Sequence, residues 1–589
     1  MTRLQVDPKH AARFVRSFTC WSAALCILSI TSCYSTPATQ RPILWKVDDR
    51  RPIPEPKEEI EGQWTMWDGA DKMVFYRIRQ LFNLGSSSRT IGTWLGLADP
   101  LESQNINAFD EAPDSTWFTN RHAVARLSQE HLANGPTQDH GRPDLSGPLE
   151  AIRGKESLGT TPGFVVRDQK RDMYLLKFDP PLNPEMTTAS EVISSRFLYA
   201  AGYNVPEHYL VDVDPARITI GEKATIRGQY HIPRAMTQED ITALLERVPH
   251  RPDGTIRAMA SKFLPGIPKG PFLYAGQRHD DPNDRIRHEN RRELRGFRVI
   301  AAFLNHTDTK APNALDMYDP EAKYLTHYLI DFSSTLGADN ADPQLPRFGN
   351  EYFLDFTTSG RSITAGGFYV RPWEIPLKME FPSVGYFESE YFDPERWRPT
   401  YPNPAFLRTT VRDAYWGAKI VTSFTDEDIE TIVRTGHFTD PAAERYVAEV
   451  LKARRDKIGR YYFNLVNPLD GFRLVKTASG EPALSFENLA LTRGYAPSSH
   501  ATYRYSIRPP SDRDVIKGLA DAPVIPLNRL VNNAGEHAAS SHGTADFIAS
   551  ITIQTSYDGG VHWSNAAEVF IRADHLTKQL SLAGLDYRS

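Results

Sequence analysis

The chain has 589 residues, which is more than one hydrophobic core usually accommodates, so we expect several domains. Its formal net charge is -5 and no broad basic stripe runs through it, which argues against a nucleic-acid-binding protein. The hydrophobic fraction of 40% and the charged fraction of 24% are ordinary for a folded protein. The 43 prolines predict long ordered loops.

The N-terminus has the pattern of an export signal. Arg13 and Arg16 precede the apolar run FTCWSAALCILSI, residues 18–30, which is too short to span a bilayer comfortably. The run ends in ITSC, which resembles the lipobox of bacterial lipoproteins, and Cys33 matches the cysteine that carries the lipid. We therefore expect a lipoprotein signal peptide at residues 1–33. The alternatives are a plain signal peptide and a buried apolar segment.

All cysteines of the chain lie in this leader: Cys20, Cys26 and Cys33. The mature chain would keep only Cys33, as its lipid anchor, so we expect no disulfide, thiolate metal site or cysteine nucleophile. The proline-rich stretch that follows predicts a tether, and residues 34–145 as a whole form a tether and N-terminal extension. The expected location is the bacterial cell envelope, lipid-anchored to a membrane, in the outer membrane or the periplasm.

The next part of the chain mixes strand and helix patterns. Residues 164–167 and 173–178 predict two strands joined by a tight turn, and residues 188–201 predict a helix that ends at Gly202. Residues 204–213 return to a strand pattern. Further on, helices are expected at residues 281–306, 424–436 and 439–463, with Asp440 as an N-cap, and a hairpin is expected at residues 314–319 and 324–332.

From about residue 470 the chain alternates apolar and polar residues as strands do. The segments that carry this pattern are residues 486–495, 503–509 and 547–572, the last of them interrupted by a DGG turn. We expect a β-sandwich-like accessory domain at residues 470–589.

The loop NHTDTKAPN, residues 305–313, carries a set of polar residues: Asp308, Lys310 and Asn313. An apolar strand follows and ends at Asp331. A carboxylate at the end of a buried strand is costly unless it is paired or bound to a metal. The alternative is a turn aspartate that binds local backbone amides.

Lys177 ends an apolar strand, so it is expected to have an acidic partner. Glu191, early in the next helix, can supply that carboxylate. Two alternatives compete with the pair: Thr188-x-x-Glu191 also fits a capping box, and Lys177 could extend from the strand edge to water.

These segments together resemble a protein kinase. HTDTKAPN is similar to the catalytic loop H-R-D-L-K-x-x-N, with matches at His306, Asp308, Lys310 and Asn313. IDFSS resembles the D-F-G motif, LLKFD the strand of the β3 lysine, and GTTPG, residues 159–163, lies where a glycine-rich loop belongs. The resemblance covers residues 146–465 and is closer to the divergent HipA-like and CotH-like kinases than to the main family.

The resemblance implies an α+β fold, with a two-lobed protein-kinase-like core between the N-terminal extension and the C-terminal all-β domain. It implies Mg²⁺ or Mn²⁺ as cofactor, ATP as co-substrate, and a protein or small-molecule hydroxyl as acceptor. Lys177, paired with Glu191, would position the nucleotide phosphates, which Gly159 and Gly163 would cover. Asp308 would orient the acceptor, and Lys310 would contact the transferred phosphate. Asn313 and Asp331 would hold the metal.

The chain departs from the kinase pattern at Thr307, which replaces the loop arginine, at Ser333, which replaces the D-F-G glycine, and at Pro162 in the glycine-rich loop. A second reading is therefore a catalytically weak or inactive kinase-like surface lipoprotein that serves as a binding or scaffold module. The presence of Asp308, Asn313 and Asp331 together favours an enzyme.

Other chemistry has weaker signals. Residues 279–289 gather histidines and carboxylates, and Asp284 and His288 are four positions apart, as metal ligands on one helix face can be. The alternative is that Asp284 caps the following helix and its neighbours form a solvated charged face. The sequence contains no G-x-S-x-G elbow, so a serine hydrolase is set aside.

Overall fold

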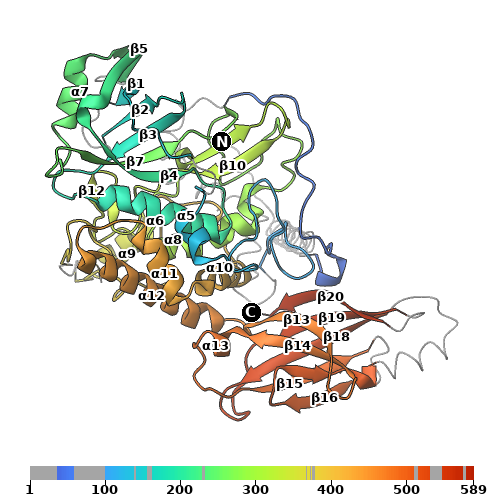
Figure 1. The fold of residues 1–589 in the computed structure, drawn as a ribbon. Helices are drawn as coiled ribbons and strands as arrows, with labels where there is room; N and C mark the ends of the chain where they lie inside the picture. The colour runs from blue at the N-terminus through green and yellow to red at the C-terminus, as the bar shows by residue number, and fades with distance from the viewer. Residues whose placement is uncertain are drawn as a thin grey trace, which may run out of the picture.

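The fold is mixed α+β, as the sequence predicts, and Figure 1 shows it in the computed structural model. The structure describes residues 36–58, 100–137, 141–155, 162–227, 233–353, 355–366, 368–371, 373, 378–509, 515–530, 547–574 and 579–588. The expected signal peptide with Cys33, and Gly159, lie outside these ranges. Among the described helices, none is both long and apolar enough to cross a membrane.

A seven-stranded sheet forms the upper layer in Figure 1, with the strand order β4-β7-β3-β2-β1-β5-β6. All neighbours are antiparallel except β1 and β5, which are parallel. The strands are β1 (Leu149–Lys155), β2 (Gly163–Arg167), β3 (Met173–Phe178), β4 (His208–Val213), β5 (Ile218–Arg227), β6 (Pro233–Ala235) and β7 (Ile256–Lys262). The strands predicted at residues 164–167, 173–178 and 204–213 are thus confirmed as β2, β3 and β4.

The alternation of β3 sets the two faces of this sheet. Tyr174, Leu176 and Phe178 are buried in an apolar cluster with the inner residues of β1, β2, β5 and α7 (Gln238–Leu245). Because neighbouring side chains of a strand point to opposite faces, Leu175 and Lys177 point away from that cluster. The other face therefore carries the lysine.

Helix α6 (Met186–Ala201) connects the sheet to the helices below it and confirms the prediction for residues 188–201. It ends at Gly202, whose φ of 118° is a backbone conformation that favours glycine. Its first turn is held by Asp179, which accepts hydrogen bonds from the Thr188 amide at 2.8 Å and the Thr188 hydroxyl at 2.7 Å. Thr188 therefore lies inside the helix and is not its N-cap.

The middle layer contains most of the remaining helices (Figure 1). They are α5 (Gln129–Asn134), α8 (Arg292–Leu304), α9 (Phe356–Thr364), α10 (Val411–Ser423), α11 (Asp426–Arg434) and α12 (Pro441–Phe463). The predictions of α11 and α12 are confirmed, including the cap at Asp440, whose side chain accepts from the Ala442 amide at 2.8 Å. Short 3-10 turns lie at Ala38–Gln40, Pro215–Arg217, His288–Asn290, Ala311–Asn313 and Phe406–Arg408.

The predicted helix over residues 281–306 is wrong in its first half, because α8 begins only at Arg292. Residues 281–291 form turns instead, and Asp284 does not cap the helix. Its carboxylate accepts from His288 Nε2 at 2.7 Å and from Arg291 Nη2 at 2.9 Å. These side-chain contacts favour the irregular backbone over the helix that the hydrophobic period predicts.

A small sheet has the strand order β10-β9-β8, and its strands β9 and β10, which follow α8 in the chain, confirm the predicted hairpin. Its strands are β8 (Ile267–Pro268), β9 (Ala314–Tyr318) and β10 (Leu325–Leu329), and β11 (Ala338–Asp339) pairs with β12 (Asp342–Pro343) farther along the chain. In the hairpin, Ala314 pairs with Leu329. The residues that follow β10 therefore return to the beginning of β9, where the loop of residues 305–313 ends.

The C-terminal strands form the lower layer in Figure 1, as two sheets in the orders β13-β14-β17 and β16-β15-β18-β19-β20. They are β13 (Leu469–Lys476), β14 (Pro482–Asn488), β15 (Thr502–Arg508), β16 (Ile516–Ala520), β17 (Val524–Pro526), β18 (Phe547–Ser556), β19 (Ala567–Ala573) and β20 (Leu580–Tyr587). The strand expected at residues 486–495 is wrong beyond Asn488, where the short helix α13 (Leu489–Thr492) begins. Tyr503 and Tyr587 share one apolar cluster with the helices, so the middle and lower layers have a continuous core.

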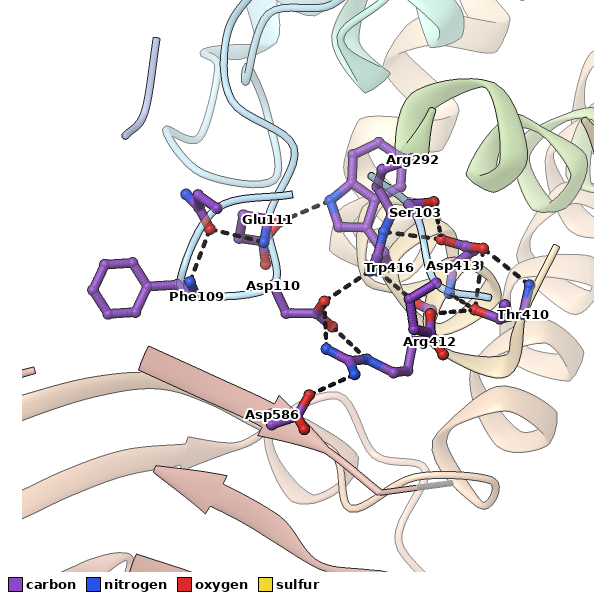
Figure 2. Close-up of polar contacts among 12 residues, drawn as sticks. Ser103, Phe109, Asp110, Glu111, Arg292, Thr410, Arg412, Asp413, Trp416 and Asp586 are labelled. Carbon is purple, nitrogen blue, oxygen red and sulfur yellow. Dashed lines mark hydrogen bonds and ion pairs between the residues drawn. The ribbon is translucent and has the colours of Figure 1, made fainter. Parts of the chain in front are cut away.

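Buried charges join the N-terminal extension to this core. Figure 2 shows Asp110 between the guanidinium groups of Arg292 on α8 and Arg412 on α10. Asp110 Oδ1 lies 2.7 Å from a nitrogen of each arginine. Arg412 also reaches Asp586 of β20 at 2.5 Å, and Arg292 reaches Asp413 at 3.0 Å. We call these residues the Asp110 cluster: Asp110, Arg292, Arg412, Asp413 and Asp586. The cluster connects the N-terminal extension with α8, α10 and β20.

Burial alone would raise the pKa of Asp110, but the charges of Arg292 and Arg412 outweigh it and lower the pKa to about 2. An unfolded aspartate has a pKa of about 3.9. The stabilisation from this carboxylate is therefore complete above pH of about 4 and is lost as the pH falls through about 2.

We predict that Asp110→Ala lowers the free energy of unfolding by about 3 to 5 kcal/mol, because it leaves buried arginines without their counter-charge. Urea denaturation near neutral pH measures the change. Asp48→Ala is the matched control, since the Asp48 side chain is 68% exposed and its ion pair with Arg51 should contribute less than about 1 kcal/mol. Equal losses for the two variants would contradict the assigned importance of the cluster.

Candidate active site

Lys177 lies between two carboxylates that come from distant parts of the chain. Its Nζ is 2.5 Å from Glu191 Oε1 on α6 and 2.8 Å from Asp331 Oδ1 after β10. The Lys177 side chain is only 11% exposed, so it does not extend to water. The other oxygen of Glu191 accepts from the Phe332 amide at 3.0 Å. Glu191 is therefore the acidic partner of Lys177, and the capping-box alternative is wrong.

The electrostatics of these three groups follow from burial and mutual attraction. Desolvation acts to lower the pKa of Lys177, but Asp331 and Glu191 outweigh it and raise that pKa. Desolvation acts to raise the pKa of Asp331, but Lys177 and the bonds from Ser333 lower it. At Glu191 desolvation prevails and the pKa is raised, although Lys177 opposes the rise. The surroundings thus favour the charged forms of Lys177 and Asp331, whereas burial opposes ionisation of Glu191.

The backbone at Asp331 is in the left-handed region, with a φ of 62°. Such a conformation costs a non-glycine residue of order 1 kcal/mol and must be held by its surroundings. The Ser333 hydroxyl donates to Asp331 Oδ1 at 2.5 Å, and the Ser333 amide lies 3.3 Å from the same atom. Ser333 therefore fixes the carboxylate, a role that the sequence did not suggest.

The loop of residues 305–313 is anchored where α8 ends. Asn305 has a φ of 50°, and its side chain bonds Gln344 Oε1 at 2.6 Å and Trp397 Nε1 at 2.8 Å. The Thr307 amide donates to the Ser334 carbonyl oxygen at 3.2 Å, and the Ile330 amide donates to the Asn313 carbonyl oxygen at 3.0 Å. These bonds hold the loop against the segment that carries Asp331.

Within the loop, Asp308 is the centre of a small polar network. Its Oδ2 accepts from Asn313 Nδ2 at 3.0 Å and lies 2.9 Å from Lys310 Nζ. Burial acts to lower the pKa of Lys310, but the negative charge of Asp308 raises it, so the lysine stays charged. Within the described chain, Asp308 Oδ1 is buried and has no hydrogen-bond partner. This oxygen can accept a proton from a group that enters the site.

A cleft of about 310 Å³ opens in front of the Lys177 pair. Its walls are mainly apolar and come from β3, β7 and the small sheet: Leu175, Met259, Leu315, Met317 and Ile330. Lys177, Glu191 and Asp331 close one end, together with His208, whose pKa burial and the charge of Lys177 lower to about 3. Mainly apolar walls with a few polar groups at one end are typical of a small-molecule binding site.

The structure explains Gly163 without a ligand. Gly163 begins β2 opposite Lys177, and a side chain there would collide with the backbone oxygen of Leu176. Strand pairing alone therefore requires glycine at this position. The other expected phosphate-covering residue, Gly159, lies outside the described residues.

The side chains around Asp284, which the sequence offered as an alternative metal site, bond to one another instead. Both oxygens of Asp284 are already bonded, to His288 and the Arg278 amide on one side and to Arg291 on the other. In the described ranges there is no group of three or more His, Cys, Asp or Glu side chains arranged to hold a metal. His288 and Asp284 are part of the packing around α8.

Among the residues that shape the cleft walls, sequence reasoning missed Met259. Met259 lies on β7, a strand that was not predicted, although the apolar run IRAMA gave a usable signal. For Ser333, the sequence shows only that a serine replaces the D-F-G glycine.

A scan of protein-family models finds no match for this chain, and a search of curated proteins finds none. The possible chemistry must therefore be inferred from the geometry of the cleft and loop.

We predict that Lys177→Met lowers the free energy of unfolding by about 3 to 5 kcal/mol, because Glu191 and Asp331 lose their counter-charge. Urea denaturation checks this. The double variant Lys177→Met/Glu191→Gln should recover part of the loss, since it removes the buried carboxylate charge as well. Lys476→Met, at an exposed position of β13, should change stability by less than about 0.5 kcal/mol. A Lys177→Met chain as stable as the control would contradict the pairing.

Proposed function

We propose that this chain is an atypical kinase, an exported and membrane-anchored protein with a two-lobed kinase-like core that transfers phosphate from a metal-bound nucleotide to a hydroxyl group. The observation that carries the proposal is the Lys177–Glu191–Asp331 arrangement at the end of an apolar cleft, next to a loop whose Asp308 has an unpartnered oxygen. Phosphoryl transfer requires mainly such positioning and charge stabilisation, with little covalent chemistry by the protein.

The nucleotide base would occupy the cleft, between Leu175 and Met259 on one side and Met317 on the other. The ammonium group of Lys177 would then lie beside the phosphates. Glu191 would keep that ammonium in place, because it is fully buried on α6 and bonded to it.

The residues present fit a magnesium ion, which prefers oxygen ligands. Among the described residues, neither Asp331 Oδ2 nor the side-chain oxygen of Asn313 accepts a hydrogen bond, while Asp331 Oδ1 and Asn313 Nδ2 are engaged. Asp331 and Asn313 would hold the ion, which would neutralise charge on the phosphates.

Asp308 would act as the general base. Its Oδ1 would accept the proton of the incoming hydroxyl, while its bonds to Asn313 and Lys310 keep the carboxylate oriented. Lys310 would move its charge from Asp308 toward the transferred phosphate, since the 2.9 Å contact between them is partly exposed. The C-terminal strands would form an accessory domain beside this core.

We predict that ATP with Mg²⁺ or Mn²⁺, at a hundred times its dissociation constant, stabilises the full chain by about 2.7 kcal/mol. Thermal unfolding with and without each metal measures this. The metal-dependent part should disappear in Asp331→Asn and persist in Asp342→Asn, a control at an exposed position of β12. No stabilisation by any nucleotide would instead support a kinase-shaped binding or scaffold module.

We predict that Asp308→Asn retains stabilisation by ATP but lowers phosphate transfer by about 10²- to 10⁴-fold, the usual contribution of a general base. Binding should survive because Asp308 bonds to Asn313 and Lys310 and makes no contact with Lys177. Transfer is measured as ATP consumption with a panel of hydroxyl acceptors, again with Asp342→Asn as control. Unchanged transfer would show that Asp308 is not the base.

A further inference from the structure

A second cavity, of about 740 Å³, lies beside α6 and away from the cleft residues. Its walls come from α5, residues 142–145, α6, β4 and the turn between α11 and α12. Three cations line it: Arg142, Lys170 and Arg196. We call it the Arg196 cavity.

Arg196 is buried without a carboxylate partner. It is 7% exposed, and its guanidinium donates to three backbone oxygens, those of Ala133 at 2.6 Å, Val192 at 3.2 Å and His208 at 3.4 Å. No ion pair to Arg196 exists among the described residues, and its Nη2 donates no hydrogen bond there. The buried Arg292 and Arg412 differ, since they face carboxylates at 2.7 Å. A buried charge is costly unless it is paired.

Arg142 and Lys170 add to the unbalanced charge. Both are exposed, and within the described ranges neither forms a hydrogen bond or an ion pair. One carboxylate, Asp144, also lies in the wall, but it is turned to Ser146, whose hydroxyl donates to it at 2.6 Å and whose amide donates at 3.0 Å. Among the described residues, three cations against one engaged carboxylate leave the cavity positive.

Burial and the positive charge of the cavity lower the pKa of two groups in its wall, His437 and Arg196. Burial and the neighbouring cations Arg257, Arg196 and Arg142 lower the pKa of His437, which lies in the same wall. Burial and the charge of Arg142 lower the pKa of Arg196 to about 10, so this guanidinium remains charged at neutral pH. An anion in the cavity would relieve this mutual repulsion.

We propose that the Arg196 cavity is a binding site for a phosphate group. The Nε and Nη1 groups of Arg196 are already bonded to backbone oxygens, so Arg196 would donate to a phosphate through Nη2. Arg142 and Lys170, which line the same cavity, would add charged donors. The volume exceeds that of inorganic phosphate and admits a phosphomonoester whose organic part lies against Tyr209 and Leu210. This site does not rest on the proposed phosphoryl transfer.

The test measures binding of inorganic phosphate to the full chain by calorimetry, with no nucleotide or metal added. Arg142→Gln/Lys170→Gln should weaken binding by about tenfold or more, because two charged donors are lost. Both residues are exposed and unbonded in the described structure, so this variant should fold normally. The control is Lys476→Gln/Lys517→Gln, which removes the same charge from exposed positions of β13 and β16 and should leave the affinity unchanged.

Two further measurements identify the source of the phosphate and distinguish binding in the Arg196 cavity from binding in the cleft. Tighter binding of glycerol 3-phosphate than of inorganic phosphate would assign a phosphomonoester, and equal or weaker binding would assign the free anion. Asp331→Asn should leave phosphate binding intact, even if nucleotide binding fails or was never present. No phosphate binding, or equal binding to Arg142→Gln/Lys170→Gln and the control variant, would overturn the proposal.

Discussion

The ion pair between Asp110 and the arginines of α8 and α10 is the constraint on which the position of the loop depends. Arg292 is in the first turn of α8, so the Asp110 cluster fixes where this helix begins. Asn305 fixes where it ends, because it is bonded to Gln344 and Trp397 and lies 3.2 Å from Arg454 Nη2. A helix held by buried polar groups at both ends cannot slide by a turn without leaving several of them unpaired. The loop with Asp308 starts at the fixed end.

Lys177, Glu191 and Asp331 join three elements that are far apart in the sequence. The lysine comes from the sheet, Glu191 from α6, and Asp331 from the end of the small sheet. The ammonium keeps both of its partners only while the sheet, α6 and the segment after β10 stay in place, so these elements are coupled electrostatically. The left-handed φ of Asp331 is held by the same contacts and by Ser333. The orientation of the Asp331 carboxylate therefore depends on the sheet as well as on its own loop.

Local patterns predicted the local structure well, and long-range side-chain bonds account for most errors. The alternation of β3 and the Asp440 cap of α12 are decided within a few residues, so both predictions hold. The start of α8 was misjudged because the helical period of residues 294–303 was extended back to residue 281, whereas Asp284 is bonded to Arg291 and Arg278 in a turn. Glu191 was a candidate cap by spacing, but Asp179 takes over the first turn of α6. The Arg196 cavity has no sequence signal, since its cations come from separate segments.

Helix α6 lies between the two sites and connects them physically. Glu191 bonds to Lys177 in the cleft, and Arg196, a little more than one turn later, lines the second cavity. His208 on β4 contacts both, because its ring Nδ1 is 3.3 Å from the Glu191 carbonyl oxygen and its own carbonyl oxygen accepts from Arg196 Nη1 at 3.4 Å. The lowered pKa of His208 keeps this ring neutral at physiological pH, so it adds no third charge between the lysine and the arginine. A shift of α6 by even 1 Å, about the scale of helix movements at interfaces, would lengthen the Lys177–Glu191 bond and reshape the Arg196 cavity together. Helix α6 is therefore the structural element that the two sites share.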